Sequence, residues 1–300
     1  MELRQLRYFI EVAEREHVTD AADHLNVAQS AISLQIAKLE SELHVQLFER
    51  VGRNVKLTPI GKIFLTHTKK ALQAIDYAKE KVDEYLDPDK GTIRVGYPTS
   101  LANYLLPTVI SAFKDRKNNI VFHLRQGSYS FLIDAVKNGE LDLAFLGPVP
   151  KKESDLEAHI LFAESISALV PIHHPLAERT SIALQELQND NFVLFPEGYI
   201  LQKIAVDACK QAGFIPKVAS EGTDMDAIKG LVAAGIGVSL LPDSTFQEVI
   251  PRYTKKVAIT TPLVKRTVGI ITSKNRDLSP SGKAFYSFVK EFFSMLEQYQ

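Results

Sequence analysis

The feature that most constrains this chain is a series of short amphipathic segments at its start. Apolar side chains recur at helical spacing over residues 3–13, and Thr19 is a good N-cap for a second helix over residues 20–25. A turn at Asn26 leads into a third, longer helix over residues 28–43. A short helix, a tight turn and a longer helix in this order predict a helix-turn-helix.

The next segment predicts a hairpin and a long helix. Two extended runs around Gly52, Arg53 and Asn54 indicate a β-hairpin, the wing of a winged helix. Thr58 and Pro59 then suit the N-cap and first position of a helix. Its apolar positions alternate spacings of four and three, as in a coiled coil, which a second subunit would bury most simply, although packing on the same chain is an alternative. The expected dimer contacts are Phe64, Ala71, Ile75, Ala78, Val82 and Tyr85.

The rest of the chain predicts an α/β fold. Asp87 to Gly91 ends the long helix, and beyond it candidate strands and helices alternate, which favours largely parallel sheets. A segment of about 210 residues is large for one such sheet, so two lobes with a cleft are expected. The predicted strands are 92–96, 121–126, 141–146, 166–170, 192–195, 238–241 and 266–271, and the predicted helices are 101–116, 129–138, 200–212, 225–234 and 281–296.

Composition and charge exclude several classes of protein. The formal net charge is −1, but residues 29–70 carry seven Lys/Arg against three Asp/Glu, a weak footprint for DNA that random clustering could also give. Apolar runs are too short to span a bilayer and the N-terminus lacks the pattern of a signal peptide, so a cytoplasmic protein without membrane contact is expected. Cys209 is the single cysteine, which makes a cysteine-based zinc site improbable, and no metal or cofactor is expected.

The third helix has a face suited to reading DNA. Its apolar side, with Ile32, Ile36 and Leu39, would be buried, while the opposite side shows small polar groups that can reach base edges in the major groove. Basic side chains on the wing would meet backbone phosphates or the minor groove. The candidate DNA contacts are Gln29, Ser30, Ser33, Leu34, Gln35, Lys38, Arg50, Arg53, Lys56, Thr58 and Pro59.

These residues resemble a known family. The segments LRYF, AA, VAQSAIS, QI, LE, LFER and LTPIG, in this order over about 60 residues, resemble the DNA-binding domain of the LysR-type regulators. The resemblance implies an all-α winged helix-turn-helix over residues 1–58, a linker and dimerisation helix over 59–87, and an effector domain over 88–300 like the periplasmic binding proteins. Within that domain, lobe I is expected at 92–162 and 266–300, and lobe II at 163–265.

The same resemblance carries functional expectations. It implies dimers that pair into tetramers, double-stranded promoter DNA and RNA polymerase as partners, and a small-molecule effector. The stretches LRQGSY, LLPTVISAF, FPEG and KRTVGII resemble members of the family that regulate glutamate synthase genes. That implies activation of an operon of nitrogen or glutamate metabolism, autorepression, and a 2-oxo acid or amino acid as effector; a different metabolic pathway remains the alternative. One departure is Leu34, where family members usually carry a polar or basic residue.

The expected effector site lies where strands of the second domain end. Hydroxyls and free backbone N–H groups follow two strands at helix N-termini, which suits an anion, although Ser100 and Ser128 could simply be helix caps. The candidate effector contacts are Thr99, Ser100, Gln126, Ser128, Gly147, Pro148, Phe195, Glu197, Glu221 and Thr223. No catalytic motif is found, so the chain is not expected to be an enzyme. A solute-binding module without DNA activity is the remaining alternative.

Overall fold

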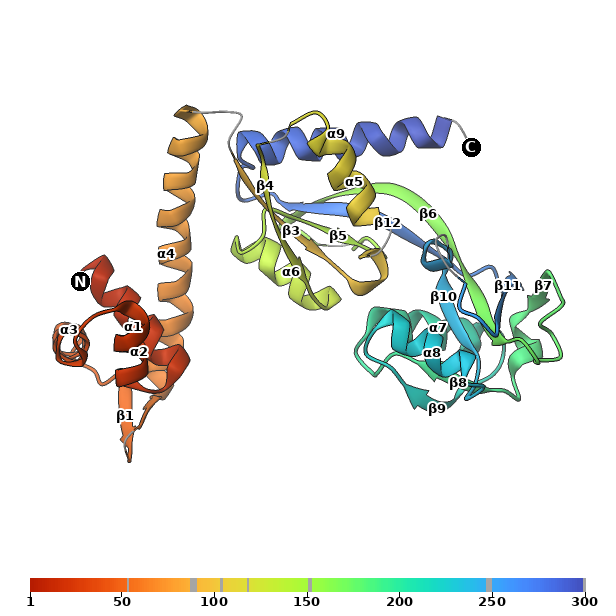
Figure 1. Ribbon diagram of the computed structural model, residues 1–300, viewed down its shortest axis with the longest axis horizontal. Coiled ribbons are helices and arrows are strands. Elements are labelled where there is room, and N and C mark those ends of the chain that lie inside the picture. The colour runs from red at the N-terminus through yellow and green to blue at the C-terminus, as the bar shows by residue number, and fades with distance from the viewer. Residues whose placement is uncertain are drawn as a thin grey trace. The chain divides into compact units, whose positions relative to one another are not determined.

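The computed structural model describes residues 1–52, 54–86, 91–102, 105–117, 119–150, 153–246 and 250–298. The chain separates into two compact units, Met1–Val82 and Asp83–Gln300, which are described one at a time. The boundary expected between residues 87 and 88 falls at positions outside the described residues. Figure 1 shows the elements of both units in chain order.

Three helices form the core of the first unit: α1 (Leu3–Arg15), α2 (Val18–Leu25) and α3 (Gln29–Leu43). Their buried faces meet around Val12, Ala21 and Ile32. The expectation that Thr19 caps α2 is wrong. His17 is the N-cap, and its imidazole accepts a hydrogen bond from the backbone N–H of Asp20 at 3.3 Å, satisfying a donor that the first helical turn leaves free.

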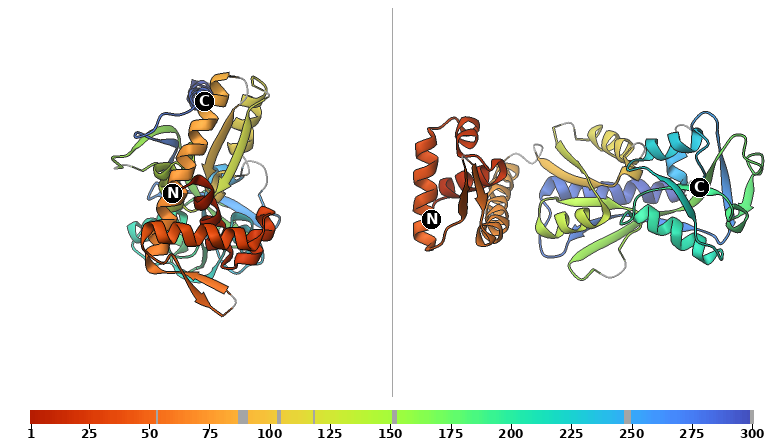
Figure 2. Two further views of the ribbon diagram at one scale, coloured as in Figure 1. Left: turned by 90° about the vertical axis from the view of Figure 1, so that its left-hand side faces the viewer. Right: turned by 90° about the horizontal axis from the view of Figure 1, so that it is seen from below.

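The wing consists of β1 (Phe48–Val51) and β2 (Asn54–Leu57), paired antiparallel with Phe48 opposite Leu57. The hairpin projects from the helices in the left view of Figure 2. Gly52 adopts a φ of +65°, a conformation that glycine tolerates in a tight turn. Arg53, also expected in this turn, lies outside the described residues.

The long helix α4 (Pro59–Leu86) starts as the sequence predicts. Thr58 Oγ1 accepts the backbone N–H of Gly61 at 3.0 Å and donates to the carbonyl of Gln46 at 2.9 Å, so Thr58 both caps α4 and anchors it to the chain before the wing. The first turn of α4 comes so close to this chain segment that a Cβ at Gly61 would lie 2.1 Å from the Leu47 carbonyl oxygen.

Lobe I of the second unit is a sheet covered on both faces. Its strands β3 (Thr92–Tyr97), β4 (Val121–Gln126) and β5 (Leu143–Leu146) are parallel, in the order β4-β3-β5. Along β5, Leu143 and Phe145 pack in one cluster and Ala144 in another, as the two-residue period of a strand requires. Figure 1 shows α5 (Leu105–Lys114) and α9 (Pro280–Gln298) on one face and α6 (Tyr129–Asn138) on the other.

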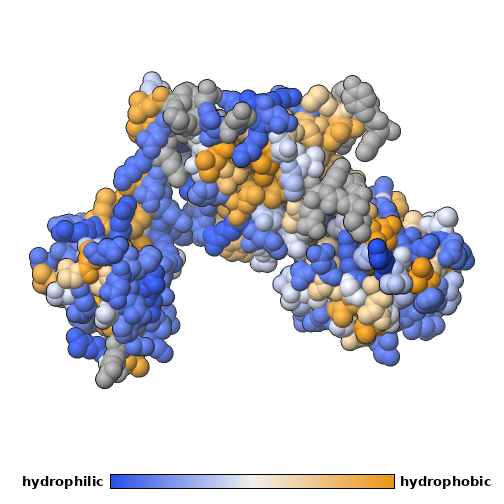
Figure 3. All heavy atoms as spheres, in the orientation of Figure 1, coloured by the Kyte–Doolittle hydropathy of each residue, from blue (hydrophilic) through white to orange (hydrophobic). Residues whose placement is uncertain are grey.

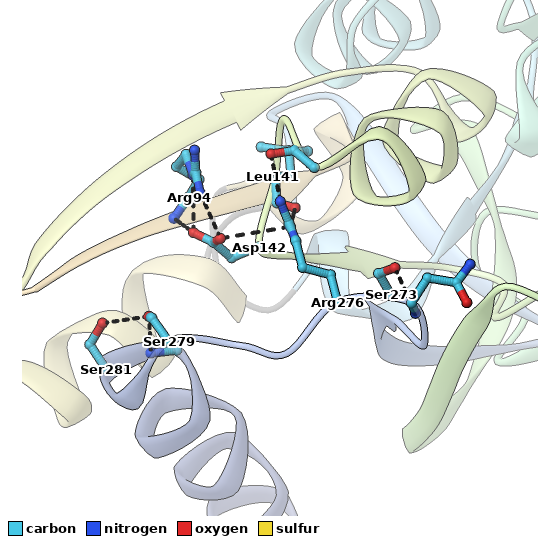
Figure 4. Close-up of polar contacts among 10 residues, drawn as sticks. Arg94, Leu141, Asp142, Ser273, Arg276, Ser279 and Ser281 are labelled. Atoms are coloured by element: carbon cyan, nitrogen blue, oxygen red, sulfur yellow. Dashed lines mark hydrogen bonds and ion pairs between the residues drawn. The ribbon is translucent and has the colours of Figure 1, made fainter. Parts of the chain in front are cut away.

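A polar network around the buried carboxylate of Asp142 supports lobe I (Figure 4). The carboxylate of Asp142 accepts the backbone N–H of Arg94 at 2.8 Å and the guanidinium of Arg94 at 3.0 and 3.2 Å. Arg276 lies 3.8 Å from the same carboxylate and donates to the carbonyls of Gly139 and Leu141 at 2.8 and 2.7 Å. These bonds fix the turn between α6 and β5.

Two long strands join lobe I to lobe II. β6 (Leu156–Pro171) and β12 (Lys265–Ser273) are antiparallel neighbours, with Arg266 opposite Glu164. β12 pairs with β5 of lobe I, whereas the last residues of β6 pair with β10 (Ser239–Pro242) and β11 (Thr254–Thr261) of lobe II. The lobe limits expected at 162/163 and 265/266 therefore fall on the two connecting strands.

Lobe II is built around β8 (Asn191–Leu194), whose side chains alternate between two apolar clusters. The helix α7 (Ile200–Gln211) packs in one cluster and α8 (Met225–Ala233) in the other. Two further strands, β7 (Ser181–Ala183) and β9 (Lys217–Glu221), pair with β11 and β8 respectively. The predicted fold class, a two-lobed α/β domain with a winged helix-turn-helix and a long linker helix, is confirmed.

Several predicted elements differ in extent. The strands β7, β9 and β11 were not predicted, and only residues 166–170 of β6 were expected to be extended. The helix expected over 101–116 is instead a short 3₁₀ turn, Thr99–Leu101, followed by α5 from Leu105, with residues 103 and 104 outside the described part.

Candidate functional site

The outer face of α3 is exposed as expected. Gln29, Ser30 and Lys38 are exposed, Ser33 and Gln35 are partly buried, and Leu34 has 56% of its surface exposed. The Gln29 side-chain amide donates to Ser33 Oγ at 2.8 Å, so these two candidate base contacts are held together one turn apart. A polar surface with one large apolar side chain at its centre can read both base edges and a thymine methyl group. On the view drawn in Figure 3, the unit that carries α3 is mostly hydrophilic.

The wing presents its two described basic side chains on opposite faces. Lys56 stands opposite Glu49 in the hairpin register, while Arg50 stands opposite Val55 one position along. Because side chains alternate across a strand, Arg50 and Lys56 cannot both face one phosphate. Both are exposed. Pro59 is exposed at the start of α4, whereas Thr58 is engaged in the capping bonds described above.

A carboxylate that was not predicted as a functional group joins α3 to the wing. Glu40 Oε1 accepts the backbone N–H groups of Leu47 at 2.7 Å and Phe48 at 3.1 Å. A charged acceptor that takes two backbone donors holds the start of β1 more firmly than a neutral one would. Glu40 thereby sets the position of the wing relative to the outer face of α3. Its place on α3 gives no local signal, because its partners lie seven and eight residues away.

The linker helix divides into a packed part and an open part. Phe64, expected in a dimer seam, instead packs within its own chain, with its ring centroid 5.1 Å from that of Phe9. Thr68 is also buried in this unit, because the first turns of α4 lie against α1. Later on the same helix, Ala71 and Ala78 are exposed, as are Val82 (58%) and Tyr85 (86%), and Ile75 is half-buried. Phe64 therefore has an aromatic partner within its own chain, whereas the later positions are left open to a second subunit.

A cleft of about 260 Å³ lies between the lobes of the second unit. Its walls come from segments that follow strand ends: the 3₁₀ turn after β3, the start of α6 after β4, and the segment between β8 and α7. Parallel sheets bind ligands at such strand ends. The lining residues are Pro98, Thr99, Ser100, Gln126, Gly127, Ser128, Tyr129, Phe195, Tyr199, Ile200, Leu201 and Thr223.

The structure brings together six of the expected effector residues, namely Thr99, Ser100, Gln126, Ser128, Phe195 and Thr223. Glu197 lines an adjoining cavity of about 400 Å³, and Glu221 is the exposed end of β9, beside Leu194. Gly147 and Pro148 are not among the lining residues. The guanidinium of Arg266 occupies the space beside Gly147 and donates a hydrogen bond to its carbonyl oxygen at 3.2 Å.

Two aromatic residues of the cleft were not anticipated. The ring of Tyr199 stacks on that of Phe195, with centroids 5.6 Å apart, and forms an apolar wall. Burial, aided by the charge of Glu153, raises the pKa of Tyr129, so its phenol stays protonated and can donate a hydrogen bond. Both tyrosines sit at helix starts, and neither position has a pattern that marks a ligand site in the sequence.

The electrostatics of the cleft come from neutral groups. None of the lining residues in the described part of the chain carries a formal charge. Ser128 Oγ accepts a hydrogen bond from the backbone N–H of Phe131 at 3.3 Å and so caps α6. The same residue also lines the cleft, so it is both a helix cap and a candidate ligand contact. Hydroxyls beside helix N-termini favour an anionic ligand.

The described residues offer neither a metal site nor a membrane-spanning helix. They contain no group of three or more His, Cys, Asp or Glu side chains placed to hold a metal ion. Among the same residues, no helix combines the length and apolar character that a bilayer crossing requires.

Family models match both units. The model of the bacterial regulatory helix-turn-helix protein of the lysR family matches residues 3–62, and that of the LysR substrate binding domain matches residues 87–294. The transcriptional dual regulator GltC of Bacillus subtilis is 66% identical over 300 residues, covering 100% of both chains. The regulator CysB of Haemophilus influenzae is 32% identical over 243 residues, 80% of this chain and 75% of that one.

Solved structures agree with these matches. Full-length CbnR in complex with its target DNA has the same fold, with a TM-score of 0.80, 24% identity, and coverage of 98% of this chain and 100% of that one. Full-length BenM is similar at a TM-score of 0.63, with 29% identity over 99% and 98% of the two chains. The matching families and relatives are regulators of transcription, so the expectation that this is not an enzyme is confirmed. The chain belongs to the LysR family of DNA-binding transcriptional regulators.

Proposed function

We propose that this regulator controls genes of glutamate synthesis and is switched by a small carboxylate of the 2-oxo acid or amino acid class. Its likeness over the whole chain to GltC, a dual regulator, supports both parts of its expected action, activation of a metabolic operon and repression of its own gene. RNA polymerase is the partner through which bound regulator would raise transcription. The proposed pathway follows from the likeness to GltC, and the proposed ligand class follows from the residues that line the cleft.

The cleft is the observation that carries the proposed ligand. Its volume of about 260 Å³ lies just below the range of roughly 300–1,000 Å³ of pockets for drug-sized ligands, which favours a small metabolite. Thr99, Ser100, Ser128 and Thr223 bring hydroxyls to one space, and the stacked rings of Phe195 and Tyr199 form a wall for a short carbon chain. Such a site suits a compact anion with a few methylene groups.

Self-association is supported by the open part of α4. Val82 and Tyr85 are apolar or aromatic side chains that this chain leaves mostly exposed on one helix. Exposed apolar seams of this kind are buried when two copies of a helix pair. A dimer would bring two copies of α3 to a partly palindromic site, and two dimers would form a tetramer.

Ligand binding and DNA binding would be coupled by a shift in the populations of two conformations. A ligand can favour one arrangement of the lobes only by binding that arrangement more tightly than the other. In a tetramer such a change would alter the spacing of the DNA-reading dimers, and with it the promoter positions that they occupy.

Two measurements on the full-length protein test the proposal. We expect it to bind a promoter fragment upstream of its own gene at moderate salt, with an affinity that falls steeply as salt rises. We also expect thermal stabilisation by one of pyruvate, 2-oxoglutarate, L-aspartate or L-glutamate, by about 2.7 kcal/mol at a hundredfold excess over its Kd. Stabilisation without any DNA binding would favour a solute-binding module instead, and no response to any of the four ligands would refute the ligand class.

A further inference from the structure

The side chain of Arg266 is buried one hydrogen bond behind the wall of the cleft. Only 3% of the residue is exposed. Its Nη1 donates to Ser100 Oγ at 3.0 Å and to the Gly147 carbonyl at 3.2 Å, and its Nε donates to Glu164 Oε1 at 2.8 Å. Ser100 lines the cleft, whereas Arg266 is not among the lining residues. The guanidinium therefore faces the cleft only through the Ser100 hydroxyl.

The direction of the bond to Ser100 determines what that hydroxyl can do. A guanidinium has donors and no acceptor, so Ser100 Oγ must accept from Arg266. The hydroxyl hydrogen then points elsewhere, and no acceptor for it is found among the described residues. Donation from a cation also polarises the hydroxyl and strengthens it as a donor. Ser100 is thus held ready to donate into the cleft.

The ion pair behind Ser100 has a defined orientation. Glu164 lies on the other side of the guanidinium, with Oε1 2.7 Å from Nη2, and its second oxygen accepts the backbone N–H of Ser244 at 2.8 Å. The positive end of the pair is therefore the end next to Ser100. Despite its closeness to Glu164, Arg266 Nη2 lacks a hydrogen bond of good geometry, and it and Ser244 Oγ are the buried side-chain atoms of the described residues without one. The partners of the ion pair therefore leave the hydrogen-bonding capacity of Arg266 Nη2 partly unsatisfied.

We propose that Arg266 is a positioning residue for the effector, which fixes Ser100 as a hydrogen-bond donor and gives an otherwise uncharged cleft its preference for a carboxylate. This inference rests on the proposed binding of a small carboxylate in the cleft, and it assigns the selectivity for charge to a residue that does not touch the ligand. Gly147 is part of the arrangement, because a Cβ there would lie 3.1 Å from the guanidinium carbon.

The test removes the charge without leaving either partner buried alone. In the full-length protein, the double variant Glu164→Gln/Arg266→Gln replaces the ion pair by two amides, since removal of one partner would leave an unpaired buried charge. Binding of 2-oxoglutarate and of L-glutamate is measured by calorimetry, with dimethyl 2-oxoglutarate as the uncharged probe. We expect the double variant to bind the preferred carboxylate at least tenfold more weakly, with little change for the ester.

Two backgrounds separate positioning from general support of the fold. In the Ser100→Ala background, neutralisation of the pair should change carboxylate affinity less than twofold, because the group through which Arg266 acts is gone. In the Thr99→Ala background, which removes a neighbouring hydroxyl that has no bond to Arg266, the tenfold loss should persist. An equal loss in both backgrounds, or no loss in the wild-type background, would overturn the inference.

Folding and the proposed function are controlled separately. A variant is taken as folded if it unfolds cooperatively on heating and its circular dichroism spectrum matches that of the wild-type protein. If the double variant does not fold, Arg266→Lys serves in its place: it keeps the charge opposite Glu164 but loses the forked donor to Ser100, and the same dependence on background is expected. If the wild-type protein binds neither carboxylate, the proposed ligand class and this inference both fail; if it binds one and the variants bind equally well, only this inference fails.

Discussion

Phe9 of α1 and Phe64 of α4 meet edge to face, with ring centroids 5.1 Å apart and an angle of 63° between the ring planes. Phe9 is fully buried and also lies against Phe48 at the start of the wing, with a centroid distance of 5.3 Å. One ring on the first helix thus contacts both the wing and the linker helix. The start of α4 is part of the DNA-binding unit, so we expect this part of the helix and the unit to move together.

Substitution of Phe64 by alanine should therefore destabilise the DNA-binding unit. We expect a loss of about 2–4 kcal/mol, at the lower side of the range for buried phenylalanines because Phe64 is only partly buried. Urea unfolding followed by circular dichroism, together with operator affinity, measures the effect. Thr66→Ala, an exposed position on the same helix, should change stability by less than about 0.5 kcal/mol. Unchanged stability in Phe64→Ala together with loss of dimers would return Phe64 to the dimer seam.

Loss of the Glu40 carboxylate should lower both the stability of the DNA-binding unit and its affinity for DNA. Glu40→Ala leaves the N–H groups of Leu47 and Phe48 without their acceptor and should cost about 1–3 kcal/mol. Operator binding should weaken as well, because the wing loses its tie to α3. The matched control is Glu42→Ala, which removes an exposed carboxylate paired with the N-terminal amine and should have little effect on either measurement. A Glu42 variant as damaging as the Glu40 variant would contradict this role.

Leu34 predicts a change in sequence preference. Leu34→Arg replaces an apolar contact with a group that can donate to guanine, so preference at one base pair should change by about 1–3 kcal/mol. Binding to a set of operator fragments, varied one base pair at a time, reports this change. Lys38→Ala should instead weaken binding to every fragment equally and reduce the slope of log affinity against log salt by about one. If Leu34→Arg left the order of the fragments unchanged, Leu34 would have no part in reading bases.

Cys209 should be inert in the native protein. It is fully buried, and burial raises the pKa of its thiol to about 12. A thiol reagent at pH 8 should react slowly in buffer and rapidly in urea, with one thiol per chain. Because the folded pKa lies above the unfolded value of about 8.5, the contribution of this group to stability is complete below that value and is lost as the pH rises toward the folded pKa. Rapid labelling without denaturant would show that the α7 side of lobe II opens readily.

Local patterns in the sequence predicted much of this architecture. The helix α6 has a pattern that depends on its own residues, with an apolar face and a cap at each end, Ser128 at the start and Gly139 at the end. The strand β9 has no such pattern, because most of its side chains are exposed on both faces and its pairing with β8 defines it. The long strand β6 was underestimated because much of its first half is exposed, including Glu157, Ala158 and Ile160, and this half is held by its pairing with β12.

The residues of the site likewise divide into those with a local signal in the sequence and those that only the fold brings together. Thr99, Ser100 and Ser128 could be predicted, because a hydroxyl at a strand-to-helix turn is a local signal. Arg266 could not, since its partners Ser100 and Glu164 lie 166 and 102 positions away and only the fold brings them together. Phe64 fitted the heptad spacing of a dimer seam equally well, and only its contact with Phe9 showed that the first turns of α4 are buried by the same chain.

The register that sets Arg266 opposite Glu164 also describes how lobe II is attached. The chain leaves lobe I along one strand and returns along its immediate neighbour, so the whole intervening segment enters and exits at a single point. Insertions, deletions or a wholesale exchange of that segment need not disturb the path of the chain on either side. An exchange of lobe II would thus replace one wall of the cleft and leave the other wall in place.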